Sequence, residues 1–218
     1  VDATEVVKDD ATGLPTELKY SASEQKDMLH NRVTTTGKPA TNGGIVTFNF
    51  THLLSKVNFT VENGSQSATG YSFVVKNITF KGAIKATYDV DDEEWTVTAN
   101  DNTVLGNERT VNSLPVKDIV VATGAASTEL GTEVLFIPGE YSISFTVDIL
   151  YNGEPVTTKD YPVAPATYTH TLKAANSYNF KVNVSVGQPI QFTVTQKPTW
   201  TDGNDSNDDG VDDTTLTL

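Results

Sequence analysis

Residues 46–61 read Val-Thr-Phe-Asn-Phe-Thr-His-Leu-Leu-Ser-Lys-Val-Asn-Phe-Thr-Val, and this stretch decides the fold. Apolar and polar residues alternate over 46–50 and again over 57–61, which is the pattern of half-buried β-strands. The alternation breaks at Leu53-Leu54. Two adjacent side chains cannot both face one side of a strand. We therefore expect the chain to bulge, bend or cross from one sheet to another at this corner.

The composition is that of a folded, acidic β protein. The chain has 218 residues, of which 37% are hydrophobic, and a formal net charge of -13. This charge opposes binding to nucleic acid or to an anionic membrane, since phosphate contacts need clustered Lys or Arg. Cysteine is absent, which excludes disulfides and thiolate sites. The chain starts at Val1 rather than Met, and we interpret it as a mature or trimmed form.

Other alternating segments follow the corner, and no segment shows a convincing helical period. The longest runs from Tyr141 to Tyr151 and ends at Asn152-Gly153, which favours a type I′ hairpin turn with Val156–Val163 as the partner strand. Further expected strands are Leu18–Tyr20, Tyr71–Val75, Asn77–Phe80, Ala83–Val90, Trp95–Thr98, Lys117–Ala122, Tyr178–Val186 and Ile190–Val194. Short strands joined by turns predict an all-β fold of antiparallel β-sandwiches.

Changes in composition divide the chain into four expected segments. Residues 1–45 are a polar N-terminal arm with one short strand, and residues 46–112 form a first β-sandwich domain. A mostly polar stretch around residue 112 marks the boundary to a second β-sandwich domain, residues 113–200. Residues 201–218 form an acidic, flexible C-terminal tail.

The three histidines, His30, His52 and His170, offer little catalytic chemistry. His52 has the strand parity of Phe48 and Phe50, and no second ligand lies at metal-binding spacing beside it. We interpret it as a buried histidine with a hydrogen-bond partner, whereas His30 and His170 lie in polar stretches. The common hydrolase, phosphate-loop and zinc-protease motifs are absent. We therefore expect no catalytic residues and no enzyme.

Two acidic stretches are candidate cation sites. In the tail, Asp205, Asn207, Asp209 and Asp213 match four ligand positions of a calcium loop, but an apolar residue stands where the bidentate Glu is needed. A disordered acidic spacer is the alternative. We interpret the other stretch, residues 89–94, as the solvated tip of a hairpin that discourages edge-to-edge pairing. No other cofactor is expected.

The corner stretch resembles the F-x-H-x-L-S-K motif of Bacteroidales fimbrillin-like proteins, the subunits of type V pili. We assign Phe48, His52, Leu54, Ser55 and Lys56 to this motif. Other segments similar to that family are Leu18–Ala22, Leu135–Gly139 and Leu172–Phe180, with Trp200 closing the domain. The resemblance spans roughly residues 18–200.

This resemblance implies two transthyretin-like β-sandwich domains in tandem and export as a lipoprotein. It also implies proteolytic trimming of an N-terminal strand, followed by polymerisation in which a strand of one subunit fills a groove in another. The expected function is that of a structural subunit of a fimbria at the outer membrane of a Gram-negative anaerobe. Other fimbrial subunits are the expected partners, with a host or bacterial surface ligand besides. The membrane contact implied is a lipid anchor, for which this chain has no Cys.

Two segments are candidates for the donated or the leaving strand, namely the N-terminal arm and residues 214–218. The candidate donor strand consists of Thr214, Thr215, Leu216, Thr217 and Leu218. Arg32-Val33 is the candidate trimming point for an arginine-specific protease, since exposed polar arms are where nicking concentrates. The alternative function is a binding module, either a pilus-tip adhesin or an outer-membrane carbohydrate-binding protein. A cluster of exposed aromatic side chains would favour that alternative.

Overall fold

The computed structural model is all-β apart from one short 3₁₀ helix, η1 (Ala22–Glu24), in the residues that it describes. Those residues are 5–31, 46–47, 50–65, 68–106, 113–115, 119–121, 127–129, 133–161, 168–188, 191–197, 211–212 and 215–216. Within these ranges, no helix has the length and apolar character needed to cross a membrane.

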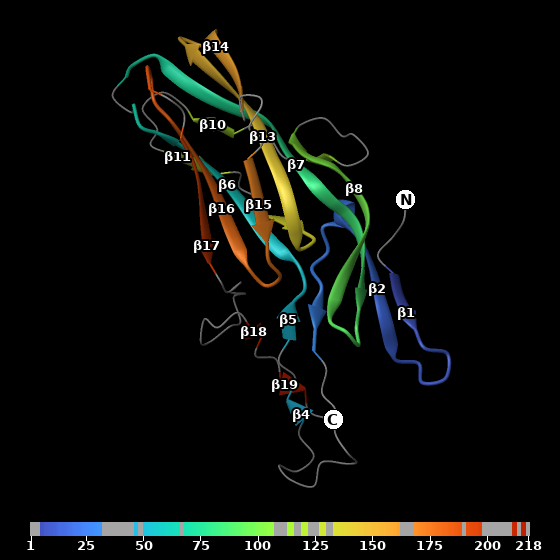
Figure 1. Cartoon of the computed structure of the whole chain (residues 1–218). Helices are drawn as coiled ribbons and strands as arrows, with labels where there is room; N and C mark the ends of the chain where they lie inside the picture. The colour runs from blue at the N-terminus through green and yellow to red at the C-terminus, as the bar shows by residue number, and fades with distance from the viewer. Residues whose placement is uncertain are drawn as a thin grey trace.

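The larger sheet is built around a single long strand, β7 (Tyr71–Asp89). The other strands of this nine-stranded sheet are β1 (Glu5–Lys8), β2 (Pro15–Ser21), β8 (Glu94–Gly106), β9 (Ser113–Pro115), β10 (Ile119–Val121), β13 (Gly139–Tyr151), β14 (Glu154–Tyr161) and β15 (Tyr168–Leu172). The second half of β7 pairs with β2 and β8, whereas its first half pairs with β10 and β13. β7 therefore joins the N-terminal strands to those of the second half of the chain (Figure 1).

The second sheet has β6 (Ser55–Asn63) at its centre. It also contains β11 (Ser127–Glu129), β12 (Val134–Phe136), β16 (Ser177–Val184) and β17 (Gln191–Lys197). β6 and β16 are parallel, whereas the other pairs of this sheet are antiparallel. A three-stranded sheet contains β3 (Leu29–His30), β5 (Phe50–His52) and β18 (Val211–Asp212), and β4 (Val46–Thr47) pairs with β19 (Thr215–Leu216).

The two larger sheets pack face to face, with β6, β16 and β17 in one layer and β7 and β13 in the other (Figure 1). Aromatic rings connect the layers. The ring centroids of Phe59 and Phe145 are 5.9 Å apart, and those of Phe80 and Phe180 are 5.4 Å apart. All four side chains belong to one hydrophobic core, to which Tyr20 of β2 also contributes. Burial of these rings supplies the main driving force for folding.

The corner predicted from the sequence is confirmed. β5 ends at His52 in the three-stranded sheet, and β6 begins at Ser55 in the five-stranded sheet. Leu53 and Leu54 lie between the two strands, and both are buried. The chain thus crosses from one sheet to another at the break in the alternation.

The hairpin turn predicted at Asn152-Gly153 is also confirmed. Both residues have positive φ angles, 50° and 86°, as a type I′ turn requires. β14 spans Glu154–Tyr161, two residues earlier in the chain than the partner predicted from the sequence.

The strand pairing does not show two tandem domains. Strands from residues 46–112 and from residues 113–200 pair with one another in both large sheets, for example β7 with β13 and β6 with β16. A single core contains side chains from both ranges. The all-β class is confirmed, whereas separate cores for the two ranges are not shown. The four-segment division stays a prediction.

Both chain ends contain described strands. The predicted strand at Leu18–Tyr20 is confirmed as part of β2, and β1 adds a second strand to the arm. In the tail, β18 and β19 pair with β5 and β4, and the expected flexibility of residues 201–218 stays a prediction. The described part of the tail therefore lies against the corner stretch.

Candidate functional site

The corner is the place where the described N-terminal segment (residues 5–31), the two large sheets and the tail meet. Leu53 is bonded to the N-terminal segment and to β8. Its N–H donates to Met28 O at 2.8 Å, and its carbonyl accepts from Trp95 Nε1 at 3.1 Å. Leu54 O accepts from Ala175 N at 3.0 Å, in the loop before β16. The two leucines thus tie together segments that are far apart in sequence.

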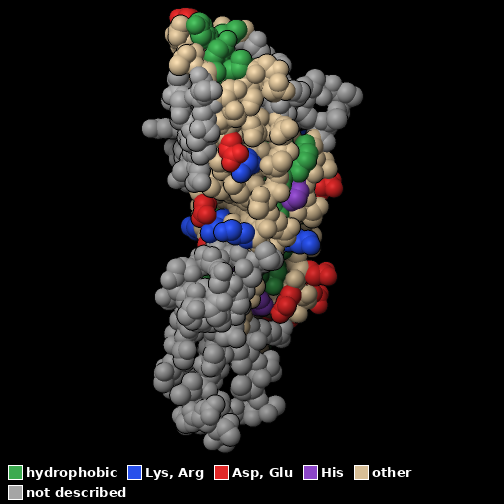
Figure 2. Space-filling view, turned by 90° about the vertical axis from the view of Figure 1, so that its left-hand side faces the viewer, with side chains coloured by type: hydrophobic (Ala, Val, Ile, Leu, Met, Phe, Trp, Pro, Cys, Tyr) green, Lys and Arg blue, Asp and Glu red, His purple; other side chains and the backbone are tan. Residues whose placement is uncertain are grey.

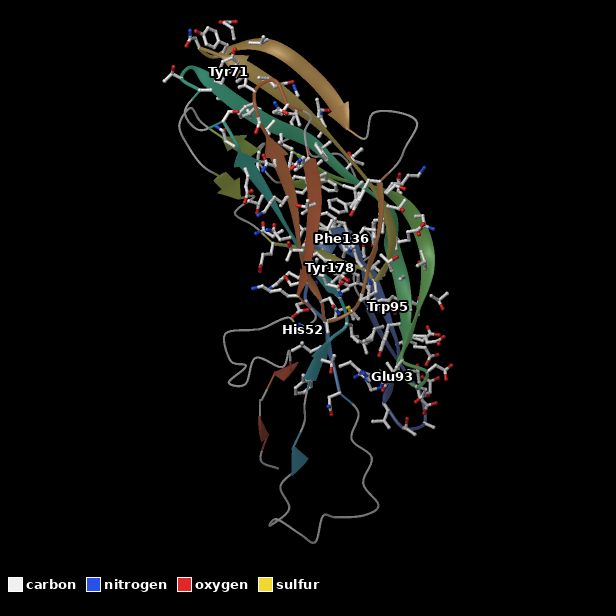
Figure 3. The ribbon with its side chains drawn as sticks, turned by 60° about the vertical axis from the view of Figure 1, so that its left-hand side comes forward. His52, Tyr71, Glu93, Trp95, Phe136 and Tyr178 are labelled. Carbon is white, nitrogen blue, oxygen red and sulfur yellow. The ribbon has the colours of Figure 1, made fainter. Side chains whose placement is uncertain are left out.

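His52 is a packing residue, as we predicted. Its side chain is 1% exposed, and the Asp27 carboxylate accepts a hydrogen bond from Nδ1 at 2.8 Å. Figure 3 shows His52 at the lower end of the sandwich, below the core residues Phe136 and Tyr178. Local sequence could not reveal Asp27 as the partner, because it lies 25 positions away in the loop between η1 and β3.

Ser55 and Lys56 attach the start of β6 to its neighbours. The Ser55 hydroxyl is fully buried and donates to Lys173 O at 2.8 Å, while Lys56 N donates to Asn176 O at 2.9 Å. Lys56 Nζ lies 3.1 Å from Glu133 Oε2. Ser55, Lys56, His52 and Leu54 therefore all make contacts that stabilise the fold. Phe48, which we assigned to the motif, lies outside the described residues. That assignment is wrong by two positions, because the spacing F-x-H places the motif phenylalanine at Phe50, in β5.

The N-terminal segment seals the core beside the corner. Tyr20 and Ala22 are buried in the common core. Gln25 fastens the segment to β12, because its side-chain oxygen accepts from Leu135 N at 2.8 Å and its amide donates to Leu135 O at 2.9 Å. The Tyr20 hydroxyl is buried but has no hydrogen-bond partner among the described residues. Burial, reinforced by the nearby charges of Asp27 and Glu24, raises the pKa of Tyr20.

The tail pairs with the strand that leads into the corner. Val211 lies opposite Thr51 in β5, and Leu216 lies opposite Val46 in β4. Both ladders are antiparallel and share one register. Thr215 and Leu216 are the described members of the candidate donor strand, and Thr214, Thr217 and Leu218 lie outside the described residues.

The structure gives no geometry for several predicted sites. The trimming point Arg32-Val33 and the calcium candidates Asp205, Asn207, Asp209 and Asp213 lie outside the described residues, and they stay predictions. In the part of the chain that is described, no group of three or more His, Cys, Asp or Glu side chains is arranged to hold a metal ion. At the acidic hairpin tip, Asp89 Oδ1 instead accepts from the backbone N–H groups of Asp91 and Asp92 at 2.8 and 2.9 Å.

The other two histidines lie against aromatic rings, so our description of their surroundings as polar is wrong. The His30 ring is 5.5 Å from the Tyr88 ring. His170 packs edge-on against Tyr178 and Phe180, with ring centroids 5.2 and 5.7 Å away. Burial lowers the pKa of His170, and its Nε2 has no partner among the described residues. At His170 the flanking Thr169 and Thr171 are exposed, because alternate residues of a strand face opposite sides, and they made the stretch look polar.

The chain belongs to the fimbrillin-like family, whose model matches residues 3–198. The fold is similar to that of a fimbrial protein from Bacteroides vulgatus ATCC 8482, with a TM-score of 0.64 and 15% identity over 91% of this chain and 72% of that chain. A second structure, described as a candidate cell adhesion protein from Bacteroides ovatus ATCC 8483, has a TM-score of 0.46 and 14% identity over 88% of this chain and 63% of that chain. No curated protein matches the sequence.

Proposed function

We propose that this chain is a structural, non-enzymatic subunit of a cell-surface fimbria and that it assembles by strand donation. Membership of the fimbrillin-like family supports this role. The fold alone does not fix a function, so the proposal depends on how the two chain ends are held. Other fimbrial subunits are the partners, and the outer-membrane surface of a Gram-negative bacterium is the location.

The observation that carries the proposal is the pairing of the tail with β4 and β5. Four residues of the tail make antiparallel pairs with Val46, Thr47, Phe50 and Thr51 in a single register. The same backbone hydrogen bonds can form between two copies of the chain. If each copy gives its tail strand to the other, every contact within one chain is replaced by the identical contact between two chains. Donation of the tail to a neighbouring copy therefore needs no new contact surface.

Release of the N-terminal segment opens further acceptor edges, separate from the edge of β5 on which the tail lies. β2 pairs with β7 through Glu17–Ser21, and β3 pairs with β5 through Leu29 and His30. Both strands precede Arg32, so a cut there disconnects them from the rest of the chain. Their departure frees an edge of β7 and an edge of β5, and it vacates the space that Tyr20 fills in the core.

Deletion of residues 201–218 tests the proposal. The described core side chains lie between Tyr20 and Val184, so we expect the shortened chain to keep the far-ultraviolet circular dichroism of the full chain. After treatment with an arginine-specific protease, the full chain should form ladders on a denaturing gel, whereas the shortened chain should not. Leu216→Asp in the full chain is the finer variant, because Leu216 lies opposite Val46. Ladders that persist after the deletion would contradict strand donation by the tail.

One observation favours the alternative of a binding module. Tyr71 and Tyr151 lie directly opposite each other at the far end of the molecule from the corner, with ring centroids 4.9 Å apart. Tyr151 is 46% exposed, and Figure 2 shows hydrophobic side chains gathered at that end. Exposed aromatic rings stack on sugar faces, so binding to a glycan array that Tyr151→Ala abolishes would support this role. Equal binding by the variant and the parent chain would contradict it.

A further inference from the structure

The side chain of Gln25 joins the N-terminal segment to the five-stranded sheet. β2 lies in the nine-stranded sheet and ends at Ser21, and η1 follows it directly. Gln25 is the next residue, and its Nε2 donates to Ala22 O at 2.8 Å and to Leu135 O at 2.9 Å. Its Oε1 accepts from Leu135 N at 2.8 Å. We call these three hydrogen bonds the Gln25 clamp.

The clamp occupies the edge of β12 that faces away from β6. Along an antiparallel pair, successive residues direct both backbone groups alternately towards the partner strand and away from it. Leu135 lies opposite Lys56 of β6, yet Lys56 N donates to Asn176 O, next to β16. Both backbone groups of Leu135 meet the Gln25 amide instead of β6. The amide therefore pairs with β12 as one residue of a neighbouring strand would.

The backbone of Gln25 is strained in this position. Its φ of 50° and ψ of 36° place it in the left-handed region, which is costly for any residue that has a Cβ atom. Such conformations persist only where surrounding contacts enforce them, and they are frequent at clamps and switch regions. The hydrogen bonds of the clamp supply this enforcement, so breaking them lets the backbone at residue 25 relax.

The clamp lies between two other attachments of the same segment. Before it, β2 pairs with β7 over Glu17–Ser21 in the nine-stranded sheet. After it, residues 27–30 contact β5 and the corner. At Gln25 the segment thus reaches from one layer of the sandwich to the other, directly after Tyr20 and Ala22 have entered the common core.

We propose that the Gln25 clamp controls how often β2 opens from the sandwich. When the clamp breaks, the relaxed backbone no longer fixes the end of β2, and the short ladder between β2 and β7 opens more readily. This inference rests on the proposed function, in which departure of the N-terminal segment frees acceptor edges. The opening itself takes place in the intact chain, before any cut or assembly.

Amide hydrogen exchange of the full-length, untrimmed chain, followed by NMR, measures this opening. In the parent chain the Leu135 N–H should be protected, because Gln25 Oε1 accepts from it. Gln25→Asn keeps an amide and suits a left-handed backbone, but its side chain is one methylene shorter and does not reach β12. Leu135 should lose its protection in this variant. The β2 amides that bond to β7 should exchange about tenfold faster, as the loss of two hydrogen bonds predicts, and the β13 amides should be unchanged.

Gln196→Asn is the matched control. Gln196 is exposed on β17, and its Nε2 donates to Asn176 Oδ1 at 2.7 Å. The control therefore makes the same chemical change and removes a side-chain hydrogen bond of the same sheet, away from the N-terminal segment. Exchange in β2 should stay at the parent rate.

Three outcomes overturn the proposal. An unprotected Leu135 N–H in the parent chain means that the clamp does not form. Parent-like exchange of β2 in Gln25→Asn means that the clamp only covers the edge of β12. Equal acceleration in β13, or in the control variant, means that the whole sandwich is destabilised. No protease and no assembly enter the measurement, so its result is independent of whether strand donation occurs.

Discussion

Removal of one oxygen atom from Tyr20 should make the protein more stable. The Tyr20 side chain is 2% exposed, and its hydroxyl has no partner among the described residues. Burying a hydroxyl without a hydrogen bond costs about 1–3 kcal/mol in proteins, because its bonds to water are lost and not replaced. Tyr20→Phe keeps the ring and its edge contact with Trp95, whose centroid is 6.3 Å away. We expect the free energy of unfolding to rise by about 1 kcal/mol.

Tyr141→Phe is the matched control, for which we expect the free energy of unfolding to change in the opposite direction. Its ring is also fully buried, but its hydroxyl lies 2.8 Å from Ile137 O and 3.0 Å from Ala83 O and donates to these carbonyls. Tyr141→Phe removes the donor and leaves two buried acceptors without it. The free energy of unfolding should therefore fall by about 1–3 kcal/mol.

Urea denaturation at neutral pH, followed by circular dichroism, compares the two variants with the parent chain. Burial raises the pKa of both phenols, so neither ionises under these conditions. If Tyr20→Phe destabilises the protein as much as Tyr141→Phe does, then the Tyr20 hydroxyl has a hydrogen bond and the reasoning fails. The expected result also bears on trimming, because an unsatisfied hydroxyl in β2 makes that strand easier to displace.

Three further predictions concern single residues. Burial favours the neutral form of His170 in the folded protein and so lowers its pKa. The stability that His170 contributes is therefore complete above the ordinary histidine pKa of about 6.5, and it declines as the pH falls below that value. In thermal melts between about pH 7 and pH 5, His170→Phe should flatten this decline. Gly82→Ala should lower the free energy of unfolding by about 1–3 kcal/mol, since the new Cβ would overlap the Tyr141 ring and lie 2.9 Å from Glu140 O; an unchanged urea midpoint would contradict this. Ser55→Ala should cost about 1–2 kcal/mol by leaving Lys173 O without its donor, and the loss should disappear in Ser55→Thr if the hydroxyl is what matters.

Local alternation was enough to find most of the strands. The inward parity of Tyr141, Ile143, Phe145 and Val147 is confirmed, since all four are buried. The adjacent pair of leucines located the corner, because no strand can bury two consecutive side chains on one face. The strand positions and the corner depend on residues that are close together in sequence, so the local pattern is sufficient to predict them.

The long strand β7 was predicted as three separate pieces. Asn77 and Gly82 interrupt its pattern, and both residues usually signal turns. In the structure Asn77 has a φ of 54° at a bulge, where the register with β13 shifts. Gly82 is needed because the Tyr141 ring packs directly on its backbone. Their roles depend on strands more than fifty residues away, so the local sequence could not reveal them.

The partners of the strands were equally hidden. β6 shows the same alternation whether it pairs with a neighbouring hairpin or with a distant strand, so the pattern could not show that its partner is β16. The tandem-domain prediction followed from the family resemblance and from the polar stretch around residue 112, neither of which shows which strands pair. The Asp27 contact to His52 was hidden for the same reason, since it joins a loop to a strand 25 positions away.

The parallel pairing of β6 and β16 has a consequence for how the protein is made. Among the described residues, every strand that pairs with β6 lies at residue 127 or later, so none of these partners is present while the first half of the chain emerges. Contacts that span so much sequence form slowly, and an apolar strand left without neighbours promotes aggregation. During synthesis the newly made chain must therefore be shielded until its last third is available, and only then can the sandwich close.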